Sequence, residues 1–123
     1  MYKKHVRDIK KAQKESLLLK EISQFFLQLM LDDKELEGLS ISRVKLSDDK
    51  SICTVFFYTP AGPEGFKEKL PQLILYKPSL RKALSQDLAL RRTPDLKFKF
   101  DNVVEKQIKI EQLLDKIKTE KPS

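Results

Sequence analysis

Two strand-like segments separated by three residues constrain the fold of this chain more than any other feature. Residues 39–47 and 51–58 are rich in β-branched and aromatic side chains, and Asp48-Asp49-Lys50 between them is a turn sequence. A connection this short joins antiparallel neighbours. The two segments therefore predict a β-hairpin.

The register of that hairpin depends on an irregularity in its first strand. In a regular strand, Leu39 and Ile41 lie on one side, whereas Val44 and Leu46 lie on the other. A β-bulge near residues 42–43 brings all four to the core side. The second strand is apolar on both sides, which is typical of the middle of a sheet.

Three segments carry the apolar spacing of helices that face a core. They are residues 13–31, 66–76 and 80–88. Pro78 separates the last two, so they predict two helices that meet at a kink near residues 76–79. We expect Pro71 in the first turn of the first of these helices, where its missing N–H costs nothing, and Ser79 as the cap of the second.

The loop predicted at residues 60–65 contains a string that resembles a phosphate-binding motif. Gly62-Pro63-Glu64-Gly65 has the GxxG spacing of a nucleic-acid-binding loop, but it lies ahead of the helix pair. Its proline and its acid oppose phosphate binding by backbone N–H groups. We interpret it as a turn.

The C-terminal third predicts one more strand and one more helix. Leu96, Phe98 and Phe100 alternate with lysines, as in a strand with one buried face. Asp101 or Asn102 then caps a helix with an apolar stripe. The stripe consists of Val103, Ile110, Leu113, Leu114 and Ile117. We expect it, like the other stripes, to be buried against the sheet.

The predicted elements follow the order α-β-β-α-(kink)-α-β-α. An α+β fold, with a three-stranded sheet and helices packed on one face, buries their apolar sides in two layers. This order is that of a type II K-homology (KH) domain, a nucleic-acid-binding fold, with an extra C-terminal helix. We place the KH-like domain at residues 13–118. A basic N-terminal extension at residues 1–12, helical or frayed, precedes it, and a polar tail at residues 119–123 follows it.

The distribution of charge favours a polyanion as the partner. The 25 Lys and Arg exceed the 18 Asp and Glu, and the excess is concentrated in residues 1–31 and 67–109. These two basic blocks form one polyanion-binding surface if the fold brings them together. The alternative is a solvated surface that only maintains solubility. Lys outnumbers Arg, which favours phosphate contact or solubility over base recognition.

The scarcity of His and Cys argues against most catalytic and metal-binding chemistry. His5 and Cys53 are the only residues of their types, which leaves no material for a catalytic triad or a thiolate zinc site. We expect no enzymatic activity, no metal and no cofactor, and Cys53 as a small core residue. The longest apolar run, about four to five residues, is far below the roughly 20 that cross a membrane, so no membrane partner is expected.

Several stretches, taken in order, resemble the ribosome-binding factor A family from about residue 13 to residue 117. LRRTPDLKF at residues 90–98 is close to the family's L-R-x-x-P-E-L-x-F, and LSISRVKLSDD at residues 39–49 resembles its strand that leads into V-S-x-D. Residues 80–84 resemble its second paired helix, and residues 101–114 resemble D-x-x-x-E-x-x-x-R-I-x-x-L-L.

This resemblance implies a type II KH fold and a cytoplasmic, non-enzymatic assembly factor. The implied partner is the immature small ribosomal subunit, near the 5′-terminal helix and decoding region of its 16S rRNA. The implied role is late 30S maturation and 16S rRNA processing, with support of growth in the cold. We also expect a monomer. In place of the family's Ala-x-Gly kink this chain has Tyr76-Lys77-Pro78, which lacks glycine-like freedom and one N–H.

The candidate RNA contacts come from the basic N-terminal block and from the surroundings of the kink. They are Lys3, Arg7, Lys10, Lys11, Lys14, Lys77, Ser79, Arg81, Lys82, Arg91 and Arg92. Arg91 and Arg92 have an alternative structural role, pairing with Asp95 at the turn into the last strand. Two other functions stay open: a general single-stranded RNA- or DNA-binding protein without ribosome specificity, and a basic adaptor for an acidic protein.

Overall fold

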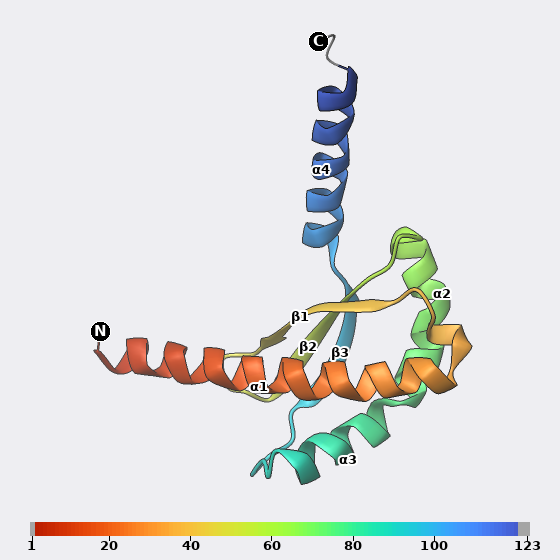
Figure 1. Cartoon of the computed structure of the whole chain (residues 1–123). Helices are drawn as coiled ribbons and strands as arrows, with labels where there is room; N and C mark the ends of the chain where they lie inside the picture. Colours follow the sequence, from red (N-terminus) through yellow and green to blue (C-terminus); the bar gives the residue numbers. More distant parts are fainter. Residues whose placement is uncertain (1, 121–123) are drawn as a thin grey trace.

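The computed structural model describes residues 2–120 of the chain, and the side chains of residues 9–118 (Figure 1). Its elements are α1 (Tyr2–Asp32), the 3-10 helix η1 (Lys34–Leu36), β1 (Ser40–Leu46), β2 (Ile52–Tyr58), α2 (Gly62–Leu75), α3 (Lys77–Asp87), β3 (Asp95–Phe100) and α4 (Asn102–Glu120). The predicted α+β fold and its element order are confirmed. α1 runs through the predicted boundary at residue 12, and the end of the predicted tail lies outside the described residues. The division into domain, extension and tail stays a prediction.

The three strands form one sheet with β2 in the middle, as its two apolar faces predict. β1 and β2 are antiparallel, and their register shifts between Ile41 and Arg43, so the predicted bulge is confirmed. β2 and β3 are parallel. The chain reaches β3 through α2 and α3, which supply the long crossover that a parallel pair needs.

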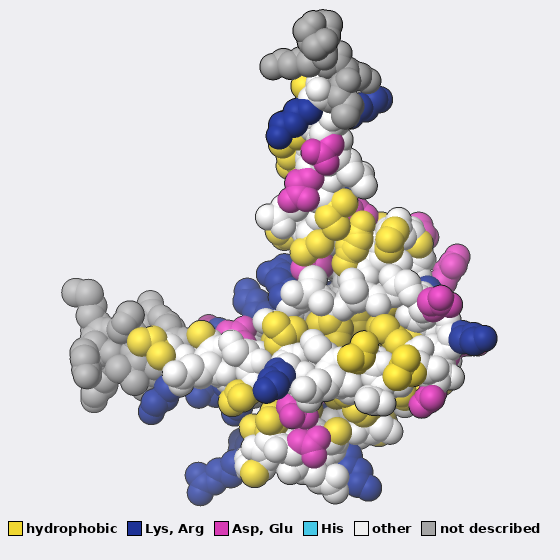
Figure 2. Space-filling view, in the orientation of Figure 1, with side chains coloured by type: hydrophobic (Ala, Val, Ile, Leu, Met, Phe, Trp, Pro, Cys, Tyr) yellow, Lys and Arg dark blue, Asp and Glu magenta, His cyan; other side chains and the backbone are white. Residues whose placement is uncertain are grey.

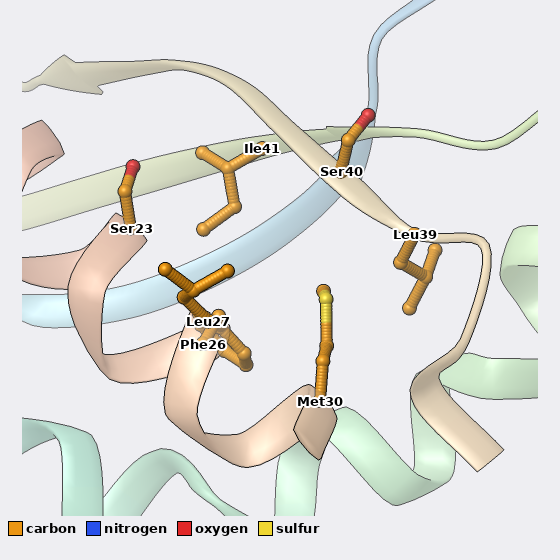
Figure 3. A pocket seen from close by; sticks show the side chains of 7 residues that line it. All are labelled: Ser23, Phe26, Leu27, Met30, Leu39, Ser40 and Ile41. Carbon is orange, nitrogen blue, oxygen red and sulfur yellow. The ribbon is translucent and has the colours of Figure 1, made fainter. Parts of the chain in front are cut away.

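The bulge turns the start of β1 toward α1. Leu39 is buried and Ile41 packs against the core at its edge. Figure 3 shows both side chains directed toward Leu27 and Met30 of α1, around an apolar hollow of about 260 Å³. The bulge therefore keeps the apolar side chains of β1 on the core face, although a regular strand would place two of them on each side.

The core lies between one face of the sheet and the helices α1, α2 and α3. Leu18, Ile22 and Phe26 of α1 are at most 1% exposed, which confirms the predicted stripe. The ring of Phe26 meets those of Phe57 and Phe98 edge-on, with centroids 5.4 and 6.0 Å apart. Edge-to-face contacts of this kind add to the stability gained from burial alone.

α2 begins earlier than the sequence analysis predicts. The segment interpreted as a loop supplies its first turn, and Gly62, with φ of +78°, turns the chain into the helix. The expectation for Pro71 is wrong, because Pro63 occupies the start of the helix and Pro71 lies in its interior. Pro71 cannot donate to the carbonyl four residues before it, so it weakens α2 locally.

α4 begins at the edge of the sheet and projects away from it (Figure 1). Asp101 is its cap, as predicted, and accepts hydrogen bonds from the N–H groups of Val103 and Val104 at 3.0 and 3.1 Å. The expected burial of the α4 stripe is wrong, since its five side chains are between 51% and 60% exposed (Figure 2). The core face of the sheet is already covered by α1, α2 and α3. Of the helices in residues 2–120, none is long and apolar enough to cross a membrane.

Candidate RNA-binding surface

The predicted kink between α2 and α3 is confirmed, and the end of α1 holds it. Tyr76 lies between the two helices, and its hydroxyl donates to Asp33 Oδ2 at 2.6 Å. Gln72 Nε2 donates to the same oxygen at 2.7 Å. The hydrogen bond from Tyr76, followed by that from Gln72, lowers the pKa of Asp33, and the same bond to Asp33 raises the pKa of Tyr76. The kink is therefore fixed by side-chain hydrogen bonds rather than by glycine.

The candidate residues at the kink do not all face solvent. Lys77 is half-buried, and its Nζ lies 5.3 Å from the ring centroid of Phe98, so it points toward the sheet. Arg81 and Lys82 are exposed on α3. The expectation that Ser79 caps α3 is wrong: Tyr76 holds the cap position without a side-chain cap, and Ser79 is an exposed residue inside the helix. Pro78 fits the first turn of α3, so the helix begins at Lys77, two residues before the expected cap.

The fold brings parts of the two basic blocks together in one pocket of about 310 Å³. We call it the basic pocket. Its charged lining residues are Lys14 of α1, Asp49 and Lys50 of the β1–β2 turn, and Arg91 and Arg92 of the α3–β3 loop. Four cations and one anion therefore surround a cavity large enough for a phosphate group. Arginine and lysine both bind phosphate, arginine with two parallel hydrogen bonds.

Hydrogen bonds hold the β1–β2 turn that forms one wall of the basic pocket. Asp49 Oδ1 accepts from the hydroxyls of Ser51 and Ser47 at 2.7 and 2.8 Å, and from Ser51 N–H at 3.1 Å. The bonds from Ser51, then Ser47, lower the pKa of Asp49 to about 2. Lys50 follows with φ of 61°, in the left-handed region. The turn is thus held in one shape, with Lys50 in the wall of the pocket.

The sequence analysis missed Lys50, because residues 38–66 carry no excess of positive charge. A signal was present in the turn itself. Lys50 is the only cation in a three-residue turn, and hairpin turns project from the end of a sheet. The sequence does not show that Lys14 of α1 and the α3–β3 loop lie beside this turn and complete the pocket.

The N-terminal candidates divide into four groups. Lys14 lines the basic pocket, whereas Lys10 is exposed on α1 outside its lining. Lys11 Nζ lies 3.1 Å from Asp48 Oδ1, so it ties α1 to the β1–β2 turn and part of its charge is compensated. The side chains of Lys3 and Arg7 lie outside the described residues.

Arg81 and the α3–β3 loop are also connected. Arg81 Nη2 donates to the carbonyl of Thr93, which lines the basic pocket, at 3.4 Å. The alternative role for Arg91 and Arg92 is not observed, since neither forms an ion pair with Asp95 among the described contacts, and both are exposed. Both guanidinium groups are therefore open to a ligand.

Cys53 belongs to the core rather than to a reactive site. It is fully buried, and burial, with a smaller effect of Glu15, raises the pKa of its thiol to about 12. The thiolate required for nucleophilic or metal chemistry is thereby disfavoured. In the part of the chain that the structure describes, no three His, Cys, Asp or Glu side chains gather in a way that would hold a metal ion.

A three-stranded mixed sheet and a kinked helix pair in this order define a KH-like domain. The family model of ribosome-binding factor A matches residues 10–114. Ribosome-binding factor A of Prochlorococcus marinus subsp. pastoris is 35% identical over 108 residues, which cover 86% of this chain and 81% of that protein. The protein of that name from Mycoplasmopsis pulmonis is 34% identical and covers 94% of this chain and 100% of its own.

The structural comparison agrees with the sequence comparison. The crystal structure of ribosome-binding factor A from Thermus thermophilus superposes with a TM-score of 0.60 at 30% identity, covering 72% of this chain and 92% of that chain. The chain belongs to the ribosome-binding factor A family.

Proposed function

We propose that this protein binds the small ribosomal subunit through its RNA and assists late 30S maturation and 16S rRNA processing. In this proposal it acts near the 5′-terminal helix of that RNA, in the cytoplasm, as a monomer without enzymatic activity or cofactor. It also supports growth in the cold. Membership of the ribosome-binding factor A family supports the ribosome as the partner.

The observation that carries the RNA part of the proposal is the basic pocket. Lys14, Lys50, Arg91 and Arg92 come from three separate segments and surround one cavity. Bringing four cations together costs electrostatic repulsion, which a bound phosphate relieves. The hydrogen-bonded turn and the loop held by Arg81 limit how far these groups must move to bind.

Co-sedimentation with purified small subunits, large subunits and assembled ribosomes, across a salt series, tests the proposal. We expect selective binding to free or immature small subunits, with an affinity that falls steeply with salt. The variant Lys50→Gln/Arg91→Gln/Arg92→Gln should lose most of this binding and unfold at the temperature of the parent. The matched control Lys34→Gln/Lys67→Gln/Lys106→Gln removes the same charge from exposed positions outside the pocket and should bind normally.

Three outcomes contradict the proposal. Equal binding to every RNA-containing particle indicates a general single-stranded RNA- or DNA-binding protein. Binding that survives nuclease treatment of the subunit indicates a protein–protein adaptor. Equal losses in the pocket variant and the control indicate that net charge, rather than the basic pocket, drives the association.

A further inference from the structure

A second cationic surface lies on the face of the sheet opposite α1, α2 and α3. Val44, Leu46, Leu96 and Phe98 point into the core, so the alternate residues of β1 and β3 point out. Those alternate residues are exposed: Arg43 and Lys45 of β1, and Asp95, Lys97 and Lys99 of β3. Asp95 lies at the start of β3, and the four cations, together with Phe56 of β2, form what we call the sheet-face patch.

The strand register arranges this patch in two rows. Arg43, Phe56 and Lys99 are paired across the three strands in one row, and Lys45, Thr54 and Lys97 in the next. The rows are two residues apart along the strands, a spacing of about 7 Å. A groove of about 360 Å³ lies along them, and none of the described residues that line it is acidic. Lys45, Lys97 and Lys99 therefore line a groove without an acidic residue, and Arg43, which is paired with Asp101, lies in the same row as Lys99.

Arg43 is held in place on this face. Its Nε donates to Asp101 Oδ2 at 2.9 Å, and its guanidinium carbon lies 4.1 Å from the ring centroid of Phe56. Asp101 is fully buried and also accepts from the Ser42 hydroxyl at 2.6 Å. The Arg43 side chain nevertheless remains 46% exposed. The Phe56 ring covers one side of the guanidinium, and the exposed remainder of the group is held toward solvent by this contact and by Asp101.

We propose that the sheet-face patch binds a segment of single-stranded RNA. A base stacks on the open face of Arg43, and Lys45, Lys97 and Lys99 contact phosphates on either side. Guanidinium planes stack on unpaired bases, whereas the carboxylates of an acidic protein segment pair with the N–H edge of a guanidinium rather than with its face. The patch shares no residue with the basic pocket, so RNA bound at one surface leaves the residues of the other available. The inference rests on the proposed function only in taking RNA as the polyanion.

Binding of a fluorescein-labelled single-stranded 12-mer RNA, followed by anisotropy across a salt series, tests the patch. We expect Lys45→Gln/Lys97→Gln/Lys99→Gln to weaken binding about tenfold and to flatten the plot of log affinity against log salt by about 2 units. The control Lys34→Gln/Lys67→Gln/Lys106→Gln should leave both quantities near those of the parent. Equal losses in the two variants overturn the proposal, as does unchanged binding in the patch variant.

The stacking of a base on Arg43 has its own measurement. An oligomer that carries 2-aminopurine should gain fluorescence on binding, because a base that moves from its neighbours in the strand onto Arg43 escapes the quenching that base–base stacking causes. Arg43→Lys keeps the charge beside Asp101 but removes the plane, so this gain should disappear while the melting temperature stays close to that of the parent. A gain that persists in Arg43→Lys overturns the role of Arg43.

Small-subunit co-sedimentation separates this inference from the proposed function. If the parent does not sediment with subunits but the patch variant loses oligomer binding, the proposed function fails and the sheet-face patch stands. If the parent sediments with subunits and the patch variant binds the oligomer normally, the patch fails and the proposed function stands.

Discussion

The hydroxyl of Tyr76 donates a 2.6 Å hydrogen bond to Asp33 Oδ2, which joins the kink between α2 and α3 to the end of α1. Asp33 also accepts from the N–H of Glu35 at 3.0 Å, so one carboxylate begins η1 and fixes the kink. Because Tyr76 precedes Lys77 and Pro78 directly, this bond sets the direction in which α3 leaves α2.

Tyr76→Phe should lower the melting temperature between pH 5 and 9, since Asp33 loses its strongest hydrogen bond. The pKa of Asp33 is lowered in the folded protein, so its contribution is present above its ordinary value of 3.8 and is lost as the pH falls through the folded pKa. The pKa of Tyr76 is raised, so its own contribution is lost only as the pH rises through the folded pKa, above 10.0. Thermal melts of both proteins across pH check this, and a difference that persists unchanged at pH 2 contradicts it.

Asp101→Ala should destabilise the protein by about 2–3 kcal/mol, because it removes the cap of α4 and the buried acceptor of Ser42 and Arg43. Urea denaturation measures this loss. Asp101→Asn, which keeps an oxygen at the cap, should lose less. Burial raises the pKa of Asp101, but the hydrogen bonds from Ser42 and Arg43 lower it further, so the net shift is downward. Its contribution should therefore fade only below pH 4, and equal stabilities of Asn and Ala variants would contradict the cap.

Lys50→Gly should separate stability from binding at the basic pocket. Lys50 has φ of 61°, a conformation that costs a side chain about 1 kcal/mol and glycine almost nothing. We expect the variant to be as stable as the parent or more so, while it binds small subunits more weakly and with a smaller salt slope. Lys50→Asn is the second variant, because asparagine also tolerates this backbone conformation but removes the positive charge. Unchanged subunit binding in both variants would remove Lys50 from the site.

Pro71→Ala should stabilise α2 by about 1–2 kcal/mol. Pro71 is exposed in the interior of the helix, so the substitution restores the missing N–H hydrogen bond and disturbs little packing. Chemical denaturation gives the free energy, and RNA binding should not change. A loss of stability would indicate that the proline shapes the helix in a way that the core requires.

Cys53 should be protected from thiol reagents in the folded protein. Burial raises the pKa of its thiol to about 12, so almost no thiolate exists at pH 8. A chromogenic disulfide reagent should react slowly with native protein and at once in denaturant. Fast reaction under native conditions would mean that this part of β2 opens readily.

The sequence predicts best those features that depend on interactions between residues close together in the chain. Pro78 marked the kink because proline cannot lie inside a helix without breaking a local hydrogen bond. Asp101 was recognised as a possible cap because capping involves only the next two or three N–H groups. Pro71 was misplaced for a related reason: a single N–H is a small loss, and a helix packed on a sheet compensates for it elsewhere.

The candidate site was accessible from the sequence only as a list of charges. Arg91 and Arg92 were identified, but Lys50 was missed, because its place beside them depends on the hairpin and the α3–β3 loop meeting at one end of the sheet. Arg43 was missed for the same reason: its partners Phe56 and Asp101 are distant in sequence and adjacent only through strand register and a buried hydrogen bond.

The sequence by itself determined the order of the elements, the bulge in β1, the central position of β2 and the kink, because each follows from local periodicity or backbone chemistry. Only the tertiary structure decided which apolar stripes are buried. The stripe of α4 has the same spacing as that of α1, yet Leu18 is buried and Leu113 is 60% exposed. Periodicity shows that a helix has an apolar face; the space left on the sheet by the other helices decides whether that face is covered.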